Sequence, residues 1–521
     1  MRDWLGRGKS LQAGVTTCCL FAFILFGYEQ GVFGPILQNE NWLNLFNHPS
    51  DSQTGIIVSC YNLGCLLGCV VAFFVGEALG RRRVIWLAMA FVFVGTTLQV
   101  TSFTVAHLII GRVITGVGTG LKTATVPMYQ SELCAATSRG RLVSAEVLCV
   151  GVGITFAYWF NFGMSFVGGA IAWRLPVALQ AAFAIFVSIL VFALPESPRW
   201  LFVHGRGEEA VEVLCAVFDK QPTDESIVAE KTAILRAIEL ESTSQNSSFF
   251  AIFRADKVRT RYRLFLAWLV QLMNQVSGIN MIVYYIPTVL QQNVGMSVQR
   301  SQVLGGCINM MFMFGSILPS LALDRMGRRR TMLWGCTGLG LCMMMTSALL
   351  SQANETPRGQ TFASASVAFF FLYQLIFGMS VNCVPWVYVP EVLPLEARTR
   401  GSAIGISSNW LWNFTVVMIT PIIVNRLRWK AYLIFMTTNL IFVPLVYFLY
   451  PETSNIRLED VDYIFSTGRN PVQVAREIQA ARKSSGGVDV ESSRDGKDSL
   501  KIEHGEILED KEAPKPHLGE N

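Results

Sequence analysis

The chain alternates long apolar runs with short polar connections, and this pattern continues from near the N-terminus to Tyr450. A helix needs roughly 20 apolar residues to cross the hydrocarbon core of a bilayer. Twelve runs meet that requirement, and each predicts a membrane-spanning helix. They cover residues 12–35, 54–75, 84–102, 106–128, 142–162, 174–194, 263–290, 302–323, 331–350, 363–389, 402–424 and 430–450.

Two polar stretches lie outside these runs. Residues 195–262 are rich in Glu, Lys and Arg and predict short amphipathic helices with a linker. The segment after Tyr450 is polar to its end, and beyond about residue 470 its composition is typical of a disordered tail. We therefore expect a six-helix bundle over 1–194, a cytoplasmic loop over 195–262, a second six-helix bundle over 263–450 and a cytoplasmic tail over 451–521.

Composition supports a membrane protein. Hydrophobic residues make up 52% of the chain and charged residues 15%, whereas a soluble domain carries about 25% charged residues. Such a chain cannot cover its surface with polar groups in water, which excludes a secreted protein, a disordered protein and a nucleic-acid binder. The 12 cysteines lie mostly inside apolar runs, without zinc-ligand spacing in a polar loop. We expect buried free thiols, no metal and no other cofactor.

Basic residues in the short connections predict the orientation, because cytoplasmic loops carry an excess of Lys and Arg. The connections after spans 2, 4, 8 and 10 are basic, and the one between spans 1 and 2 has no Lys or Arg. Both termini are therefore expected in the cytoplasm. We expect the protein to lie in the plasma membrane. One connection disagrees, since Arg426, Arg428 and Lys430 fall on the expected outer side, but the other loops outweigh it.

Charged motifs return in the same order in the two halves of the chain. The segment 76–83 recurs as 323–330, Ser131-Glu132 as Pro390-Glu391, and 195–197 as 451–453, each about 250 residues later. Two similar six-span halves can rock around a central site. We expect the charged residues at one end of the spans to form a cytoplasmic latch that holds the halves together in an outward-open state. Its expected members are Glu77, Arg81, Glu132, Arg139, Glu196, Asp324, Arg328, Glu391, Arg400 and Glu452.

Together these motifs resemble the sugar porters of the major facilitator superfamily, over roughly residues 12–466. The matching stretches are 26–32, 111–118, 127–132, 195–201, 275–280, Tyr284-Tyr285, 385–388 with Glu391, and 451–453 with Leu458-Glu459. The stretch that begins at Tyr28 is similar to fungal hexose and pentose transporters. The resemblance implies an all-α protein with twelve transmembrane helices in two six-helix pseudo-repeats, working by alternating access.

An ionisable side chain inside a span is costly and is by default a functional candidate. Glu29 lies in span 1 and Arg112 in span 4. In proton-coupled sugar porters an acid and an arginine occupy the equivalent positions, so the resemblance implies that Glu29 carries the proton and Arg112 modulates it. Burial favours a neutral carboxyl and a nearby guanidinium favours the charged form. The alternative is a permanent neutralising ion pair.

The resemblance also implies the sugar-binding residues. Neutral amides can hydrogen-bond hydroxyl groups, and aromatic faces can cover the C–H face of a ring. The implied set is Phe26, Asn274, Gln275, Asn280, Tyr284, Trp386, Asn409 and Trp410. Taken singly, each polar residue could instead bond a neighbouring helix.

Two departures from the family pattern affect the predicted pocket. Val147 stands where the family has a sugar-binding glutamine in span 5, and Glu146 precedes it; Asn309 is offset from the family's span 8 asparagine. The substrate of other sugar porters therefore cannot be carried over. Glu146 could bind a hydroxyl, pair with Arg141 or Arg139, or titrate.

The resulting expectation is a transporter, not an enzyme, that moves a monosaccharide with a proton across a lipid bilayer. Three alternatives stay open. The substrate could be a polyol, a sugar acid or a quinate-like solute. The protein could be a proton-independent sugar facilitator, although such a protein has no need for Glu29. It could also be a transporter-like nutrient sensor that signals through its tail.

Overall fold

The computed structural model describes residues 6–134, 139–245, 256, 258–353, 357–394, 397–454, 456 and 458–484. Every element within these ranges is helical. The first half of the chain contains α1 (Lys9–Gly31), α2 (Phe33–Ile36), α3 (Glu40–Leu45), α4 (Asp51–Leu79), α5 (Arg81–Val100), α6 (Val105–Glu132), α7 (Arg139–Met164), α8 (Ile171–Ala193), α9 (Pro198–Val203), α10 (Gly207–Phe218) and α11 (Glu225–Gln245).

The second half repeats the long helices. It contains α12 (Thr260–Val276), α13 (Ile279–Val294), α14 (Val298–Met326), α15 (Arg328–Gln352), α16 (Gly359–Met379), α17 (Val384–Val392), α18 (Arg398–Leu427), α19 (Lys430–Leu449), α20 (Leu458–Ser466) and α21 (Pro471–Ser484).

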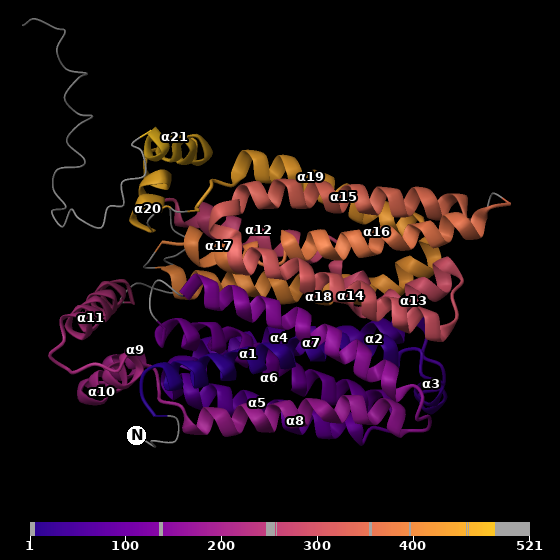
Figure 1. The fold of residues 1–521 in the computed structure, drawn as a ribbon, viewed down its shortest axis with the longest axis horizontal. Coiled ribbons are helices and arrows are strands. Elements are labelled where there is room, and N and C mark those ends of the chain that lie inside the picture. The colour runs from indigo at the N-terminus through magenta and orange to yellow at the C-terminus, as the bar shows by residue number, and fades with distance from the viewer. Residues whose placement is uncertain are drawn as a thin grey trace, which may run out of the picture.

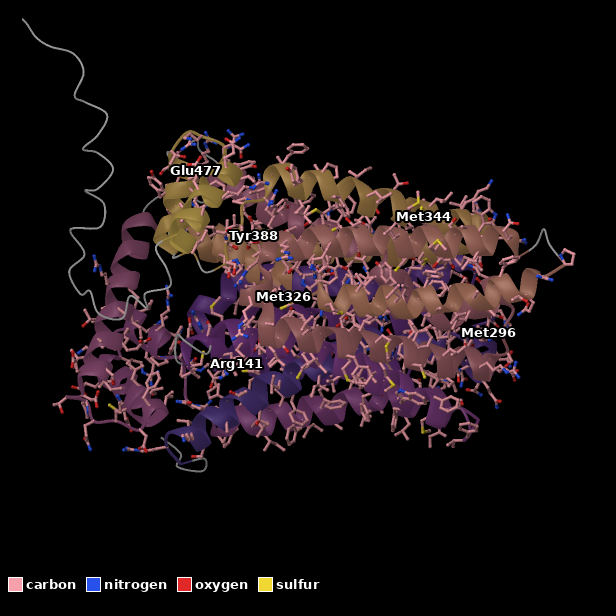
Figure 2. All side chains as sticks on the ribbon, turned by 45° about the horizontal axis from the view of Figure 1, so that its top comes forward. Arg141, Met296, Met326, Met344, Tyr388 and Glu477 are labelled. Atoms are coloured by element: carbon pink, nitrogen blue, oxygen red, sulfur yellow. The ribbon has the colours of Figure 1, made fainter. Side chains whose placement is uncertain are left out.

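The long helices lie side by side as two bundles, α1–α8 and α12–α19, here called the N-terminal and C-terminal bundles (Figure 1). Helices α9–α11, α20 and α21 gather at one end. This end also carries Arg81–Arg83 and Arg328–Arg330, so we call it the basic end; the opposite end, with α3 and the α13–α14 connection, is the distal end. Figure 2 shows Arg141 and Tyr388 toward the basic end and Met296 toward the distal end.

Eleven helical segments of the described chain are long and apolar enough to cross a membrane. The remaining predicted span, over 106–128, falls on α6, which packs against α4 and α5 and carries Arg112 and Lys122 in its interior. These charges lower its apolar character, although its 28 residues are ample for a span. The twelve predicted spans are therefore all helical in the structure.

Large apolar side chains cover the outside of the bundles. Phe74 on α4 is 72% exposed and Leu321 on α14 is 76% exposed, and Ile189 and Phe448 are similarly open. Exposed side chains of this size on many helices are what a bilayer-facing surface requires, since a soluble protein rarely leaves such patches in water.

Two predicted spans are interrupted rather than continuous. The span expected over 263–290 breaks at Ser277–Gly278, where Gly278 has φ 104°, a conformation that L side chains rarely adopt. The Ser277 carbonyl, which the break leaves without a helical partner, accepts hydrogen bonds from Tyr373 Oη at 3.0 Å and Asn439 Nδ2 at 2.7 Å. Helix-breaking backbone is tolerated at membrane depth when neighbouring helices satisfy it in this way.

The second interruption lies in the span expected over 363–389, which separates into α16 and α17 around Ser380–Cys383. The Val381 carbonyl in this break accepts a hydrogen bond from Asn274 Nδ2 at 2.8 Å. This bond joins the last turn of α12, just before the first break, to the second break. The two breaks therefore bring irregular backbone and polar side chains to the middle of the C-terminal bundle.

Part of the segment expected as a disordered tail is helical. Helix α21 covers residues 471–484, and its Val474 and Ala475 are buried where it packs against α19 and α20. Its apolar side chains recur at helical spacing, a signal that the overall polarity of the segment concealed. The rest of the tail, residues 485–521, lies outside the described residues.

Candidate functional site

A pocket lies between the two bundles, in the middle of the molecule. The N-terminal bundle contributes side chains from α1 and α7, and the C-terminal bundle contributes the amides and rings around both helix breaks. Six of the eight predicted substrate residues line it, namely Phe26, Asn274, Gln275, Asn280, Trp386 and Asn409. No charged side chain is among the described residues that line this pocket.

Gln275 is the centre of an amide network in the pocket wall. Its Nε2 donates to Asn274 Oδ1 at 2.7 Å and to Asn409 Oδ1, and its Oε1 accepts from Asn280 Nδ2 at 2.7 Å. Residues 275 and 280 flank the α12–α13 break, and Asn409 comes from α18. The network fixes the orientation of four amides from three helices, which pre-organises donors and acceptors for hydroxyl groups.

The other two predicted substrate residues do not line the pocket. Trp410 is fully buried, and its ring meets the Phe26 ring edge-on at a centroid distance of 5.6 Å. Tyr284 is also buried, and its hydroxyl has no hydrogen-bond partner among the described residues. Trp410 therefore supports the pocket wall from behind, through Phe26.

Several lining residues were missed by the sequence analysis. Gln30, Asn382 and Asn413 add amides, and Phe312 and Phe377 add stacked rings with a centroid distance of 5.7 Å. Asn413 follows Asn409 by one helical turn, and this spacing could have identified it. Asn309, the offset span 8 residue, lies outside the pocket and accepts a hydrogen bond from Gln374 Nε2 at 3.0 Å.

Glu29 lies in a closed polar cluster beside the pocket and is 1% exposed. Its Oε2 accepts hydrogen bonds from Tyr61 Oη at 2.9 Å, Thr119 Oγ1 at 2.6 Å and Lys122 Nζ at 2.9 Å. Its Oε1 has no partner among the described residues. The carboxylate is thus held by three donors on one oxygen and retains unused hydrogen-bonding capacity on the other.

Lys122, not Arg112, forms the ion pair with Glu29. Arg112 donates from Nη2 to the Val58 carbonyl at 2.9 Å, and its guanidinium lies over the Phe33 and Tyr61 rings. Because the Tyr61 hydroxyl donates to Glu29, Arg112 reaches the carboxylate only through this ring. The structure therefore brings Glu29 and Arg112 into one cluster without direct contact.

The signal for Lys122 was present in the sequence. It is an ionisable residue inside the fourth predicted span, and the argument that selected Glu29 and Arg112 applies to it equally. On α6 it lies one turn beyond Thr119, so both side chains share the face that meets α1.

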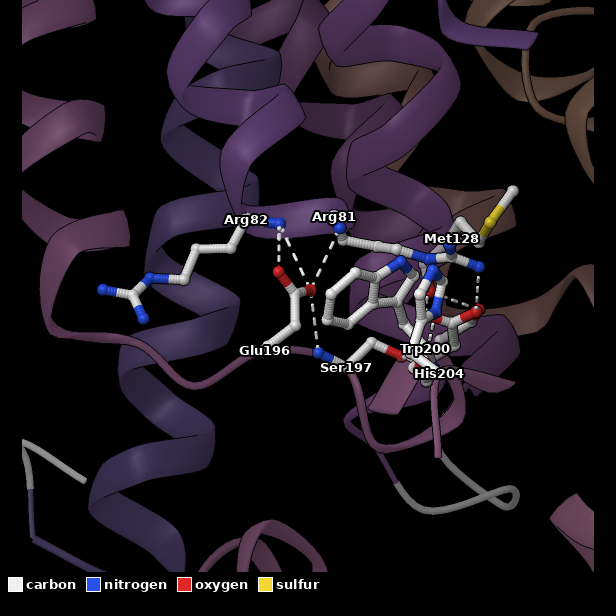
Figure 3. A network of polar contacts seen from close by, with 9 residues as sticks. Arg81, Arg82, Met128, Glu196, Ser197, Trp200 and His204 are labelled. Carbon is white, nitrogen blue, oxygen red and sulfur yellow. Dashed lines mark hydrogen bonds and ion pairs between the residues drawn. The ribbon is translucent and has the colours of Figure 1, made fainter. Parts of the chain in front are cut away.

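At the basic end of the N-terminal bundle, Glu196 caps the start of α5 (Figure 3). Its carboxylate accepts from the backbone N–H of Arg81 at 3.0 Å and of Arg82 at 3.2 Å. Burial raises the pKa of Glu196 above its ordinary value, and the backbone N–H donors of Ser197, Arg82 and Arg81 oppose this effect. The Arg81 guanidinium forms a two-pronged ion pair with Glu132, at 3.0 and 3.1 Å.

The C-terminal bundle repeats this arrangement. Glu452 accepts from the backbone N–H of Arg328 at 2.7 Å and of Arg329 at 3.0 Å, and the Arg328 guanidinium pairs with Glu391 at 2.7 and 3.1 Å. A Cβ on the glycine before each cap, Gly80 or Gly327, would lie 2.7 Å from the capping carboxylate. The internal repeat seen in the sequence is thus also a repeat of atomic contacts.

These ion pairs join helices within one bundle and do not join the two bundles. The expected latch members Arg81, Glu132 and Glu196 meet in the N-terminal bundle, and Arg328, Glu391 and Glu452 meet in the C-terminal bundle. Arg400 takes part in neither cluster. The side chains of the remaining expected members, Glu77, Arg139 and Asp324, lie outside the described residues.

Glu146 forms no ion pair with the described residues, and the side chain of Arg139 lies outside them. Its side chain is 1% exposed, and neither carboxylate oxygen of Glu146 has a hydrogen-bond partner in the part of the chain that the structure describes. Arg141, one of the two proposed partners, is exposed on the same helix. Glu146 also does not line the pocket, whereas the adjacent Val147 does.

Comparisons with known proteins agree with this architecture. The model of the family described as "Sugar (and other) transporter" matches residues 15–465. The MFS-type transporter oryC of Aspergillus oryzae is 39% identical over 471 residues, covering 90% of this chain and 87% of that protein. The sugar transporter STL1 of Saccharomyces cerevisiae is 32% identical, covering 91% of this chain and 85% of that protein.

A quinate permease of Neurospora africana is also similar, with 32% identity over 87% of this chain and 89% of its own length. Among solved structures, the proton:xylose symporter XylE of E. coli, bound to 6-bromo-6-deoxy-D-glucose, superposes with a TM-score of 0.74 at 21% identity. The match covers 88% of this chain and 100% of that chain. At this identity the likeness to XylE establishes the fold.

Proposed function

The chain belongs to the family of sugar (and other) transporters, as an integral multi-pass membrane protein, and we propose that it moves a neutral monosaccharide together with a proton by alternating access. The observation that carries this proposal is the central pocket, whose lining combines neutral amides with aromatic rings and draws on both bundles. A site between two bundles can be exposed to either side of the membrane in turn as the bundles rock.

The pocket chemistry supports a neutral polyhydroxylated solute. The amides of Asn274, Gln275, Asn280 and Asn409 offer both donors and acceptors, which suit hydroxyl groups. The Trp386 ring offers an apolar face for the C–H side of a sugar. A buried anion would need a cationic partner, and none is among the described lining residues.

We propose Glu29 as the proton site, with Lys122 as its direct counter-charge and Arg112 as an indirect one. A proton on Glu29 would abolish the attraction to Lys122 and release α1 from α6. Phe26 and Gln30, which are on α1 beside Glu29, line the pocket and provide the path by which substrate occupancy affects the ion pair. A permanent Glu29–Lys122 pair would instead make the protein a proton-independent facilitator.

The basic end supports a proposal for the sidedness of the protein in the membrane. We propose that this end, with Arg81–Arg83 and Arg328–Arg330, faces the cytoplasm, that both termini lie there and that the membrane is the plasma membrane. We further propose that the described charge clusters of each bundle stabilise the ends of α5 and α15, so that the bundles move as separate units.

Uptake into proteoliposomes tests the proposal. The full chain is reconstituted, and a panel of labelled hexoses, pentoses, polyols and quinate is offered with and without an inward proton gradient. We expect accumulation of a monosaccharide that depends on the gradient. Glu29→Gln should lose this accumulation and retain equilibrative exchange, because it keeps the shape of the side chain and removes its titration.

The same panel decides between the alternatives. Preferential uptake of quinate or a sugar acid would favour the activity named for the Neurospora relatives. Gradient-driven accumulation that is unchanged in Glu29→Gln would contradict proton coupling at this residue. Absence of uptake of every solute, with binding retained, would favour a nutrient sensor.

A further inference from the structure

Glu146 is a buried acid that the proposed mechanism does not use. It lies on α7, is 1% exposed, and both of its carboxylate oxygens lack a hydrogen-bond partner among the residues that the structure describes. An ionised carboxylate in such a place would lose its hydration and gain nothing in return, at a cost of several kcal/mol. The arrangement is compatible with a protonated, neutral side chain and unfavourable for a charged one.

The described groups that surround Glu146 do not supply a compensating charge. The titratable side chains that face it are Cys19 on α1 and Cys149 on α7, with Cys134 next to Cys19. No Lys, Arg or His on the described parts of α6, α8, α14 or α17, which also pack against α7, forms an ion pair with it. Neutral thiols are poor hydrogen-bond partners, so they leave the carboxyl in an apolar environment.

Glu146 also lies next to the seam between the two bundles. Two residues before it, Ser144 Oγ is 3.5 Å from Cys383 Sγ, which belongs to the α16–α17 break of the C-terminal bundle. The next residue, Val147, lines the central pocket. Separation of the bundles at the basic end would break the Ser144–Cys383 contact and bring water to this part of α7.

We propose that Glu146 is a second proton-binding site, which holds its proton while the seam at the basic end is closed and releases it to water on that side when the seam opens. Low pH on that side then favours the closed seam and high pH favours the open one. This inference rests on the proposed alternating-access function and adds to it a proton site separate from Glu29. The two sites lie on different helices and do not contact each other.

Hydrogen–deuterium exchange of α7 tests the inference without a substrate. The purified full-length protein is compared at about pH 5.5 and about pH 8, values that bracket neutrality, after correction for intrinsic exchange rates. We expect residues 139–164 of the wild type to exchange faster at the higher pH. In Glu146→Gln, whose neutral amide imitates the protonated acid, this pH dependence should be lost, with slow exchange at both values.

Three further variants complete the design. Glu146→Asp keeps a titratable group and should keep the pH dependence. Glu29→Gln should also keep the pH dependence, because Glu29 is a proton site separate from Glu146. Glu208→Gln, which removes an exposed acid on α10, is the matched control and should behave as the wild type.

The inference is wrong if wild-type exchange in α7 does not depend on pH, if Glu146→Gln retains the wild-type dependence, or if Glu29→Gln abolishes it. Uptake by the same wild-type preparation tests the proposed function independently. A transporter that accumulates sugar but shows no pH dependence in α7 would therefore reject only the second proton site.

Discussion

Lys122 Nζ lies 2.9 Å from Glu29 Oε2, and both side chains are 1% exposed. An ion pair so deeply buried gains a strong attraction but loses the hydration of both charges, so its net contribution to stability is small or negative. This cost makes the pair a functional candidate, since an apolar pair of similar volume would stabilise the bundle at least as well.

Removing one partner of this pair should destabilise the protein strongly. Lys122→Met leaves the Glu29 carboxylate buried with only two neutral donors, Tyr61 and Thr119. We expect a loss of about 3–5 kcal/mol in the free energy of unfolding. The double variant Lys122→Met/Glu29→Gln should recover much of it, because no uncompensated charge remains. Thermal unfolding in detergent measures both effects.

Lys122→Arg is the control for this cycle, because it keeps the charge and changes the geometry. The free energy of unfolding of Lys122→Arg should be closer to that of the wild type than the value for Lys122→Met is. If the double variant were as unstable as the sum of the two single variants, the two residues would not be coupled, and the ion pair would have no energetic role.

Much of the fold could be predicted because each element has a local signature in the sequence. The apolar length of the spans, the paired motifs around Arg81 and Arg328 and the positions of Glu29 and Gln275 were all visible without coordinates. The helix breaks were not, because Gly278 alone does not distinguish a break from a tolerated glycine. The break depends on Tyr373 and Asn439, which lie far along the chain.

The partner of Glu29 could not be determined from spacing. Arg112 and Lys122 are both on α6, and which of them meets α1 depends on the rotation of α6 against α1 and α4. That rotation is set by backbone contacts at glycines, such as Gly116 against the Tyr61 carbonyl. Family resemblance favoured the arginine, and the packing selects the lysine.

Close backbone packing between α1 and α7 should make one glycine intolerant of substitution. A Cβ on Gly153 would lie 2.1 Å from the Ile24 carbonyl oxygen, and backbone atoms cannot move aside as a side chain can. We expect Gly153→Ala to lower the free energy of unfolding by about 1–3 kcal/mol or more, and to reduce uptake. Thermal unfolding and transport assays of the reconstituted variant measure these effects.

Gly163 provides the matched control on the same helix, since a Cβ there would meet nothing within 4 Å. Gly163→Ala should be neutral or stabilising by up to about 1 kcal/mol, because alanine favours the helix. Equal losses for the two substitutions would mean that the α1–α7 contact does not limit stability.

The amide network predicts unequal contributions from its members. Gln275 bonds three other amides, whereas Asn280 bonds only Gln275 among the described residues. Asn280→Ala should weaken substrate affinity about tenfold, corresponding to a lost hydrogen bond of about 1–1.5 kcal/mol. Gln275→Ala should weaken it further, because three partners lose their orientation. The half-saturating substrate concentration for uptake gives the comparison.

Asn293→Ala serves as the control for these two variants. Asn293 also uses its amide, donating to Tyr432 Oη at 2.6 Å, but it lies outside the pocket lining. Its replacement should reduce stability and leave the half-saturating concentration unchanged. A larger effect of Asn280→Ala than of Gln275→Ala would contradict the central position of Gln275.

Glu196 should give the folded protein a defined pH dependence. Because burial raises its pKa in the folded state, the folded protein binds more protons than the unfolded chain at pH values between the ordinary pKa and the raised one. The free energy of unfolding contributed by this group therefore falls as pH rises through that interval. Glu196→Gln lacks the titration, so its stability relative to the wild type should increase from about pH 4 to about pH 7.

Thermal unfolding midpoints of both proteins across this pH range measure the effect. Glu196→Gln also weakens the cap on α5, because an amide offers one acceptor oxygen to the N–H groups of Arg81 and Arg82 where the carboxylate offers two. This loss is constant in pH and shifts the whole curve downward, whereas the titration changes its slope. Curves for wild type and variant that stay parallel would show that the Glu196 carboxyl titrates alike in the folded and unfolded states.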